Sequence, residues 1–196
     1  MTLPTTLRHL PAAGHADMPW KNGLGRTAEI ARHPQDGDAF DWRLSIATIE
    51  ADGPFSAFAG CDRTLIPIEG QGLALDFADG TTLQAACFGA MRFAGEAPCM
   101  GRLLGGRTRD LNVITRRATM THDATVATLP LRLTCAGDTT LIVALGGAMT
   151  IATDSGRWRL DADDALRIDG AGVDIRAMAI DPGARVAIAT LRRRAG

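Results

Sequence analysis

The stretch TLIPIEGQGLALDFADGTTL, residues 64–83, is the main indication of the fold, because it recurs as TLIVALGGAMTIATDSGRWRL in residues 140–160. The two stretches align without a gap, with residue 64 on residue 140 and residue 80 on residue 156. Each predicts an apolar strand, a glycine turn, an alternating strand, a second turn at Asp79-Gly80 or Ser155-Gly156, and a return strand. One strand unit therefore occurs twice in this chain.

Around this repeat, short apolar runs broken by Gly, Asp and Pro recur along the chain, and few windows have the period of an amphipathic helix. This rhythm is typical of a sandwich or barrel. The order of strands and turns resembles the cupin double-stranded β-helix. We therefore predict an all-β bicupin of two jelly-roll barrels packed together, with an N-terminal half over residues 1–117 and a C-terminal half over residues 118–196. The N-terminal segment could complete either barrel.

Composition excludes several classes of protein. Of the 196 residues, 46% are hydrophobic, which is enough for a buried core. The net charge of -1 and the pI near 6.4 give no basic footprint for nucleic-acid binding. The sequence also lacks the apolar run of a signal peptide or of a membrane span. We expect a cytoplasmic protein that binds neither nucleic acid nor membrane.

The cysteines and histidines do not form a metal-site pattern. Cys61, Cys87, Cys99 and Cys135 are widely spaced without a C-x-x-C pair, and we expect reduced and mostly buried thiols. The four histidines are scattered, and none lies in a duplicated strand unit. The sequence also lacks H-E-x-x-H, G-x-S-x-G and P-loop motifs. We expect no metal and no cofactor.

Two polar motifs precede the repeat. In PWKNGLGRTAEI, residues 19–30, the side chains of Trp20, Lys21 and Asn22 precede closely spaced glycines, which suits a ligand loop or a tight turn anchored by a buried Trp. In FDWRLSIATI, residues 40–49, alternation puts Arg43 and Ser45 on the face opposite the apolar side chains. That polar face lines a cavity or faces solvent, and the pattern favours neither.

Two further motifs flank the first copy of the repeat. In GPFSAFAGCDR, residues 53–63, Phe55 is a packing or stacking residue, and Arg63 forms an ion pair with its neighbour Asp62 or helps to hold an anion. In LLGGRTRDLNVITRR, residues 103–117, period 2 places Asp110, Asn112 and Arg116 on one face of a strand. Such groups suit bidentate recognition of a small carboxylate, although a solvated edge strand has the same pattern.

These four motifs, in this order, resemble the HutD/Ves family over residues 18–117. The resemblance implies a metal-free bicupin without an established enzymatic activity. Some members are encoded beside histidine-degradation genes, where sensing of a pathway intermediate has been suggested. The family's motif residues fall on Trp20, Lys21, Asn22, Arg43, Ser45, Phe55, Arg63, Asp110, Asn112 and Arg116.

Three functions remain open. The first is a regulator that binds a small carboxylate such as formylglutamate or urocanate, with Lys21, Arg43 and Arg116 as its cationic partners. The second is a metal-free cupin enzyme, an isomerase or hydrolase, with Asp110 or Lys21 as acid or base. The third is a structural or partner-binding protein that uses the second barrel, which lacks polar motifs. The oligomeric state is open, with a homodimer as one arrangement.

Overall fold

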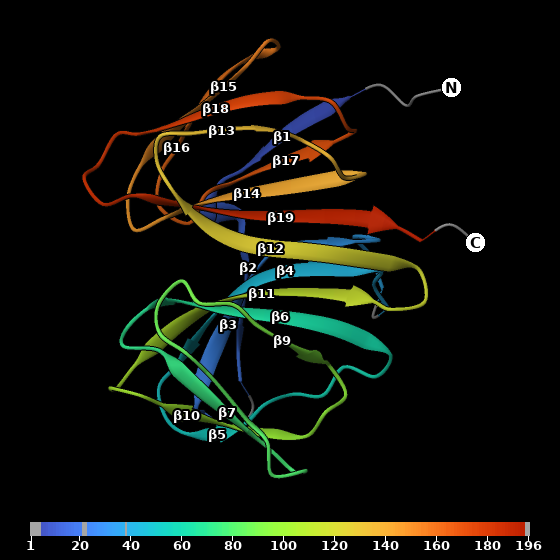
Figure 1. The fold of residues 1–196 in the computed structure, drawn as a ribbon, viewed down its shortest axis with the longest axis vertical. Coiled ribbons are helices and arrows are strands. Elements are labelled where there is room, and N and C mark those ends of the chain that lie inside the picture. Colours follow the sequence, from blue (N-terminus) through green and yellow to red (C-terminus); the bar gives the residue numbers. More distant parts are fainter. Residues whose placement is uncertain (1–4, 21–22, 38, 195–196) are drawn as a thin grey trace. The chain divides into compact units, whose positions relative to one another are not determined.

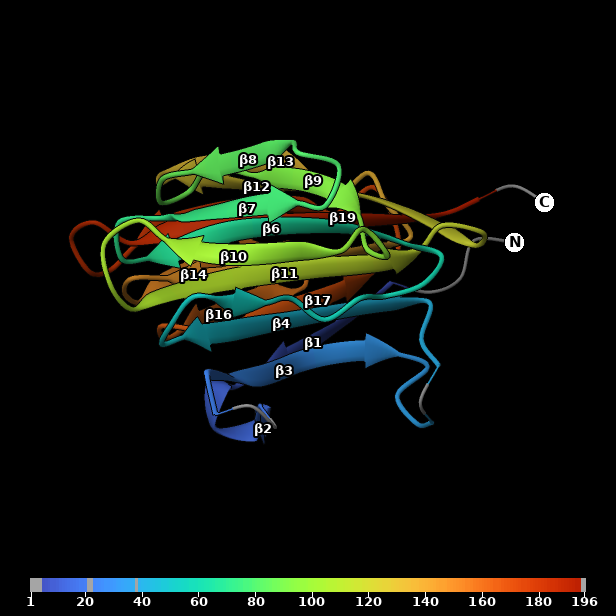
Figure 2. The same cartoon turned by 90° about the horizontal axis from the view of Figure 1, so that it is seen from below.

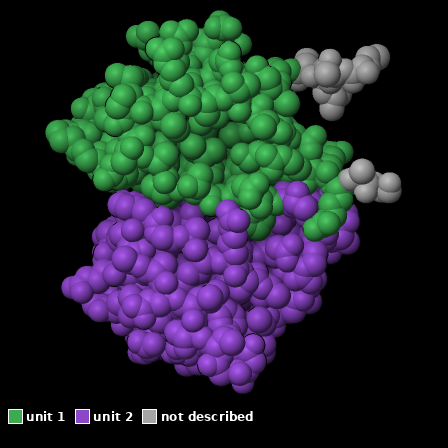
Figure 3. Space-filling model, in the orientation of Figure 1, with its two compact units in different colours: residues 1–14, 122–196 green, residues 15–121 purple. Residues whose placement is uncertain are grey.

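The chain is built of β-strands, as its sequence predicts. The computed structural model describes residues 5–20, 23–37 and 39–194. Within these ranges the only helix is the short 3-10 helix η1 (Ala12–Gly14). Two compact units share the chain: unit 1 comprises Met1–Gly14 with His122–Gly196, and unit 2 comprises His15–Thr121 (Figure 3).

Unit 2 consists of two sheets with a core between them. The six-stranded sheet has the order β2-β3-β4-β11-β6-β9, and the four-stranded sheet has the order β5-β10-β7-β8 (Figures 1 and 2). Leu65 and Met91 from the first sheet pack with Leu73 and Leu75 from the second. The strands are β2 (Ala16–Pro19), β3 (Gly25–His33), β4 (Trp42–Ile49), β5 (Gly53–Pro54), β6 (Cys61–Glu69), β7 (Leu73–Phe77), β8 (Thr82–Ala85), β9 (Met91–Ala94), β10 (Cys99–Leu103) and β11 (Thr108–Arg116).

Unit 1 also consists of two sheets. Their orders are β1-β17-β14-β19-β12 and β13-β18-β15-β16. Ile142 and Leu166 from the first sheet share a core with Met149 and Ile175 from the second. The strands are β1 (Thr6–Leu10), β12 (Met120–Thr128), β13 (Leu131–Thr134), β14 (Thr139–Leu145), β15 (Met149–Thr153), β16 (Gly156–Leu160), β17 (Ala165–Asp169), β18 (Asp174–Ala179) and β19 (Arg185–Arg193).

The N-terminal strand belongs to unit 1. It pairs antiparallel with β17, from Thr6 opposite Asp169 to Leu10 opposite Ala165. The predicted halves, residues 1–117 and 118–196, place this segment with the first half, whereas in the structure it clusters with the last 75 residues, His122–Gly196. A strand's sequence pattern specifies its buried face but not which sheet edge it extends.

The duplication is longer in the structure than in the sequence. The strand order β4-β11-β6-β9 of unit 2 returns as β12-β19-β14-β17, and β5-β10-β7-β8 returns as β13-β18-β15-β16. The repeated arrangement therefore includes strands on either side of the matched residues. Among the described residues no sheet closes on itself, so each unit is a pair of facing sheets.

A β-bulge in β6 changes which residues of the two repeat copies occupy equivalent positions in the sheets. Between β11 and β6 the register moves from Arg109 opposite Glu69 to Asp110 opposite Pro67, so one residue of β6 is extra. As a result Leu65 points into the core of unit 2, whereas in unit 1 Ile142 takes that place instead of the sequence-aligned Leu141. A one-residue shift reverses which face a side chain joins.

The described cysteines are all free thiols, and Cys61, Cys99 and Cys135 are buried as expected. Burial raises the pKa of the Cys135 thiol, as it does for Cys61 and Cys99. These side chains therefore act as small apolar packing groups. In the part of the chain that the structure describes, no helix is long and apolar enough to cross a membrane.

Candidate ligand-binding site

Strand β4 separates an apolar face from a polar one. Trp42 and Leu44 on the apolar face are 2% and 0% exposed. On the opposite face Arg43 and Ser45 line a cavity. The pattern of this strand allowed either a cavity or a solvent-facing position for these two side chains, and in the structure they face the cavity.

This cavity has a volume of about 420 Å³ and lies entirely within unit 2. Such a volume suits a small metabolite. Strands of the six-stranded sheet and the segment around β5 contribute to its wall. Its lining residues are Pro19, Trp20, Thr27, Arg43, Ser45, Ala47, Pro54, Phe55, Ser56, Phe58, Arg63, Asn112 and Ile114.

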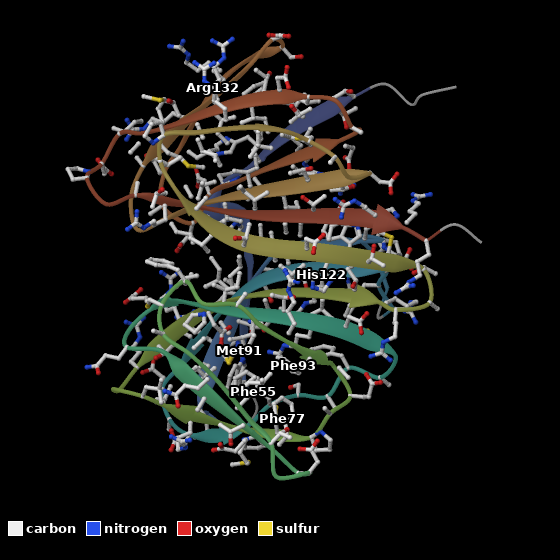
Figure 4. The ribbon with its side chains drawn as sticks, viewed as in Figure 1. Phe55, Phe77, Met91, Phe93, His122 and Arg132 are labelled. Atoms are coloured by element: carbon white, nitrogen blue, oxygen red, sulfur yellow. The ribbon has the colours of Figure 1, made fainter. Side chains whose placement is uncertain are left out.

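Arg63 on β6 is a buried cation in the wall of the cavity. Arg63 is only 6% exposed. Its guanidinium lies 5.0 Å from the ring centroid of Phe55, 5.7 Å from that of Phe58 and 5.4 Å from that of Phe93. Phe55 and Phe93 are labelled in Figure 4, where both belong to the core side of the sheets. Three aromatic faces stabilise the cation and limit its movement.

The polar partner of Arg63 is neutral. Nε and Nη2 both donate to Oδ1 of Asn112, at 2.9 and 2.5 Å, and Nη1 donates to the carbonyl oxygen of Ser56 at 3.5 Å. Burial lowers the pKa of Arg63 to about 10, and the nearby Asp110 counteracts this effect. The guanidinium thus stays charged at neutral pH without a carboxylate in direct contact.

Two N–H groups of Arg63 remain for a ligand. A guanidinium has five N–H donors, and the hydrogen bonds to Asn112 and Ser56 occupy three of them. One N–H is left on Nη1 and one on Nη2. Both can donate to the oxygens of a bound carboxylate.

Asp110 lies two residues before Asn112 on β11 and does not line the cavity. It is 0% exposed, and its Oδ1 accepts a short hydrogen bond from Nδ2 of Asn112. This bond turns the amide oxygen of Asn112 toward Arg63. Burial raises the pKa of Asp110 to about 7, while Arg63 and the Asn112 hydrogen bond act in the opposite direction. Its Oδ2 has no hydrogen-bond partner among the described residues.

The other side of the cavity contains a second cation and an aromatic wall. Nε of Arg43 donates to Oε2 of Glu29 at 2.5 Å, and both side chains are 14% exposed. The indole Nε1 of Trp20 donates to Oγ1 of Thr27 at 2.8 Å. The Trp20 ring meets Phe55 edge-on at 6.4 Å between centroids. The indole face is therefore held in position by one polar and one aromatic contact.

The structure brings together most of the residues predicted from the motifs. Six of them line the cavity: Trp20, Arg43, Ser45, Phe55, Arg63 and Asn112. Asp110 accepts a hydrogen bond from Asn112 without lining the cavity itself. Lys21 and Asn22 lie outside the described residues.

Arg116 is not among the residues lining the cavity. Its Nη2 donates to the carbonyl oxygen of Phe40 at 3.0 Å, and its Nε lies 3.7 Å from Asp41. Period 2 placed Arg116 correctly on the face of Asn112, but it lies at the end of β11, beyond the cavity. Strand periodicity predicts a face and not the position of a cavity along it.

The ion pair considered for Arg63 and Asp62 is not formed. Nε of Arg117 donates to Oδ1 of Asp62 at 2.7 Å instead. Adjacent residues of a strand point to opposite faces, so Arg63 points inward while Asp62 points away from the cavity. The remaining alternative, that Arg63 helps to hold an anion, fits its position.

Four residues of the site were not predicted from the motifs: Thr27, Glu29, Ser56 and Phe58. All four lie inside the quoted motifs, and Phe58 lies three residues after Phe55. Glu29 lies on β3 directly opposite Ser45 of β4. Only the pairing of β3 with β4 makes that relation visible.

The equivalent position in unit 1 is apolar. Asn112 is opposite Leu65 in unit 2, and the corresponding pair in unit 1 is Ile188 opposite Ile142. Ile188 packs against the core cluster of that unit. The polar arrangement of Arg63, Asn112 and Asp110 thus belongs to unit 2.

Comparison with known proteins identifies the family of the chain. The family model of HutD matches residues 12–187, which includes nearly all of both units. The chain belongs to the HutD family. A relative from Pseudomonas putida, described as an uncharacterized 21.2 kDa protein in the hutC 3' region, is 38% identical over 84% of this chain and 87% of that protein.

Two further comparisons extend this result. Protein Ves of Citrobacter koseri is 36% identical over 50% of this chain and 52% of that protein. The solved structure of HutD from Pseudomonas fluorescens SBW25 is 30% identical, covers 97% of this chain and 100% of its own, and has a TM-score of 0.84. The predicted resemblance to the HutD/Ves family is therefore confirmed.

A more distant likeness concerns the fold alone. A cupin 2 conserved barrel domain protein from Leptotrichia buccalis is 8% identical and covers 85% of this chain and 88% of its own, with a TM-score of 0.52. This HutD-family chain thus has a cupin-like all-β fold. Among the described residues, no group of three or more His, Cys, Asp or Glu side chains is placed to hold a metal ion.

Proposed function

We propose that the cavity of unit 2 binds a small carboxylate metabolite and that this binding regulates histidine utilisation. The observation that carries the proposal is the buried guanidinium of Arg63, which lines the cavity and has only a neutral amide and a carbonyl as polar partners. A buried charge without a direct counter-charge is unfavourable. A ligand carboxylate would supply that counter-charge.

The geometry favours a ligand with one carboxylate on Arg63 and a second polar group near Arg43. The free N–H groups on Nη1 and Nη2 of Arg63 can donate to both oxygens of a carboxylate. Arg43 shares its charge with Glu29, so it suits a second, more weakly held group. The Ser45 hydroxyl can orient that group, and Trp20 and Phe55 enclose the apolar part.

Two metabolites fit these requirements. Formylglutamate has two carboxylates and a polar formamide, which would use both arginines and Ser45. Urocanate has one carboxylate and a flat ring, which would place its ring against Trp20. The description of the Pseudomonas putida relative by the hutC region supports the choice of this pathway.

We further propose that the two units correspond to the two halves of a bicupin. The eight-strand order that recurs in both units supports this, as does the cupin-like fold of distant structures. Only the half with Arg63 and Asn112 would bind the carboxylate.

Thermal unfolding in the presence of formylglutamate, urocanate and formate tests the proposal. A ligand that binds only the folded state at about one hundred times its Kd raises the free energy of unfolding by about 2.7 kcal/mol. For a chain of this size that corresponds to several degrees in Tm. Arg63→Lys should remove the shift, because an ammonium keeps the charge but loses the planar fork.

Arg116→Ala is the matched control. It removes an arginine from the neighbouring strand β11 without altering the cavity wall. We expect it to keep the ligand-induced shift. Arg43→Gln provides a second test if Arg63→Lys fails to fold. No shift with any of the three carboxylates at about 10 mM, far above the Kd of a metabolite sensor, would refute the proposal.

The alternative is an enzyme that uses the same cavity. One observation favours it: burial raises the pKa of Asp110 to about 7, within the range of a general acid or base. Asp110, however, does not line the cavity, because Asn112 lies between it and Arg63. Conversion of formylglutamate or urocanate, abolished by Asp110→Asn, would establish the enzyme instead.

A further inference from the structure

The four-stranded sheet of unit 1 has a polar outer face. In β13, β18 and β15, Leu133, Ile175 and Ile151 point inward and pack in the core of the unit. The side chains between them point to the opposite face. Arg132 is one of these, and Figure 4 labels it on the outer side of β13 and β18. The sequence motifs gave no indication of a site in this half of the chain.

Three arginines stand in one row across this face. The strand register places Arg132 opposite Arg176, Arg176 opposite Ala152, and Ala152 opposite Arg157. All three arginines are exposed. Neighbouring strands lie about 4.8 Å apart, so the row extends over about 14 Å. The small side chain of Ala152 leaves space between the guanidinium groups.

The row has no counter-charge within residues 5–20, 23–37 and 39–194, because Arg132, Arg157 and Arg176 form neither an ion pair nor a hydrogen bond there. Two carboxylates of this unit have other partners. Asp174 accepts a hydrogen bond from Thr134, and Asp161 accepts one from Arg159. Like charges directly opposite each other on adjacent strands are destabilising.

Several other surface arginines of this protein form ion pairs, in contrast to the three of the row. The ion pairs are Arg26 with Asp17, Arg102 with Asp76, Arg117 with Glu96, and Arg192 with Asp123.

The internal repeat shows that the row is not a consequence of the fold. In unit 2 the corresponding row runs from Pro54 on β5 through Met100 and Asp76 to Thr82. That row contains no arginine and one carboxylate. The positions in unit 2 that correspond to the three arginines are therefore uncharged.

The arginine row borders a cavity of about 520 Å³ on this outer face. Its lining includes the three arginines, Thr150 on β15, and the apolar Pro130 and Met178. Met178 is 53% exposed. This volume falls within the range of small-molecule sites. The combination of three cations, a hydroxyl and an apolar border is that of a site for an anionic metabolite.

We propose that this cavity binds a small molecule with at least two phosphate or carboxylate groups. Arg132 and Arg176, on adjacent strands, can clamp one anionic group, since guanidinium groups bind phosphate and carboxylate bidentately. Arg157, about 10 Å from Arg176 across two strand spacings, can bind a second group. The site shares no residue with the cavity of unit 2.

Isothermal titration calorimetry with pyrophosphate, citrate and orthophosphate tests this site. At about 0.15 M salt, where exposed charges are screened beyond about 8 Å, we expect pyrophosphate or citrate to bind once per chain and more tightly than orthophosphate. Binding of pyrophosphate alone identifies phosphate groups as the ligand chemistry, and binding of citrate alone identifies carboxylates. The double variant R132Q/R176Q should weaken binding at least about tenfold.

The double variant R102Q/R192Q is the charge-matched control. It removes the same number of positive charges from exposed, ion-paired positions. We expect it to bind the probes as the wild type does, and we expect R63K to do the same. Equal weakening by both double variants would reduce the site to nonspecific attraction and overturn the proposal, as would the absence of binding by both pyrophosphate and citrate.

Discussion

Replacing Asp110 by Asn should change how the stability of the protein depends on pH. Asp110 is fully buried, and burial raises its pKa to about 7 from the ordinary value of 3.8. Asn has nearly the same shape and can still accept the hydrogen bond from Nδ2 of Asn112. The variant therefore removes the titration while retaining the contact that orients Asn112.

The sign follows from proton binding. Between about pH 4 and pH 7 the folded protein holds a proton on Asp110 that the unfolded chain has released, so the free energy of unfolding decreases as the pH rises. The contribution is fully present below about pH 4 and is lost above about pH 7. Each tenfold difference in proton affinity corresponds to about 1.4 kcal/mol, so the total reaches about 4 kcal/mol.

Urea unfolding monitored by tryptophan fluorescence at intervals from about pH 4 to pH 8 measures this effect. Asp110→Asn should gain stability relative to the wild type as the pH rises, by up to about 4 kcal/mol in all. Asp36→Asn, at an exposed position of unit 2, should run parallel to the wild type. If the Asp110→Asn profile is also parallel, Asp110 does not titrate near neutrality. If the variant instead becomes less stable relative to the wild type as the pH rises, the charge of Arg63 affects the pKa of Asp110 more than burial does, and the reasoning is wrong.

Two further predictions concern the cavity and its chemistry. A Cβ at Gly101 would lie 2.2 Å from Cε2 of Phe55, so Gly101→Ala should displace this ring, abolish the ligand-induced thermal shift and lower the free energy of unfolding by about 1–3 kcal/mol in urea titrations. Protein purified without chelator should contain no tightly bound transition metal by elemental analysis. Iron, zinc, manganese or nickel near one equivalent, removed only with loss of folding or binding, would contradict this expectation.

Much of the site could be predicted from local patterns. Alternation along β4 separates Arg43 and Ser45 from Trp42 and Leu44, because successive side chains of a strand point to opposite faces. The same rule places Asn112 beside Asp110. The loop and turn motifs also singled out Trp20 and Arg63 as candidates, and both line the cavity in the structure.

Other features depend on contacts between strands distant in sequence. Arg63 is recognisable as a buried cation only when β6 lies beside β11, which brings Asn112 to it, and when three phenylalanine rings surround it. The position of Arg116 outside the cavity also depends on how the strands pack, and not on the motif. A motif indicates which side chains share a face, but not how far along the strand the cavity extends.

Residue types and the period of two along a strand were enough to predict the all-β class, the duplicated strand unit and the polar face of β4. Tertiary structure alone decided that β1 joins β17 and that the bulge in β6 puts Leu65 and Ile142 in equivalent core positions. It also decided that Arg132, Arg157 and Arg176 form one row. The physical reason is that strand register and sheet order are set by the summed packing of non-local side chains, which no single segment of the chain encodes.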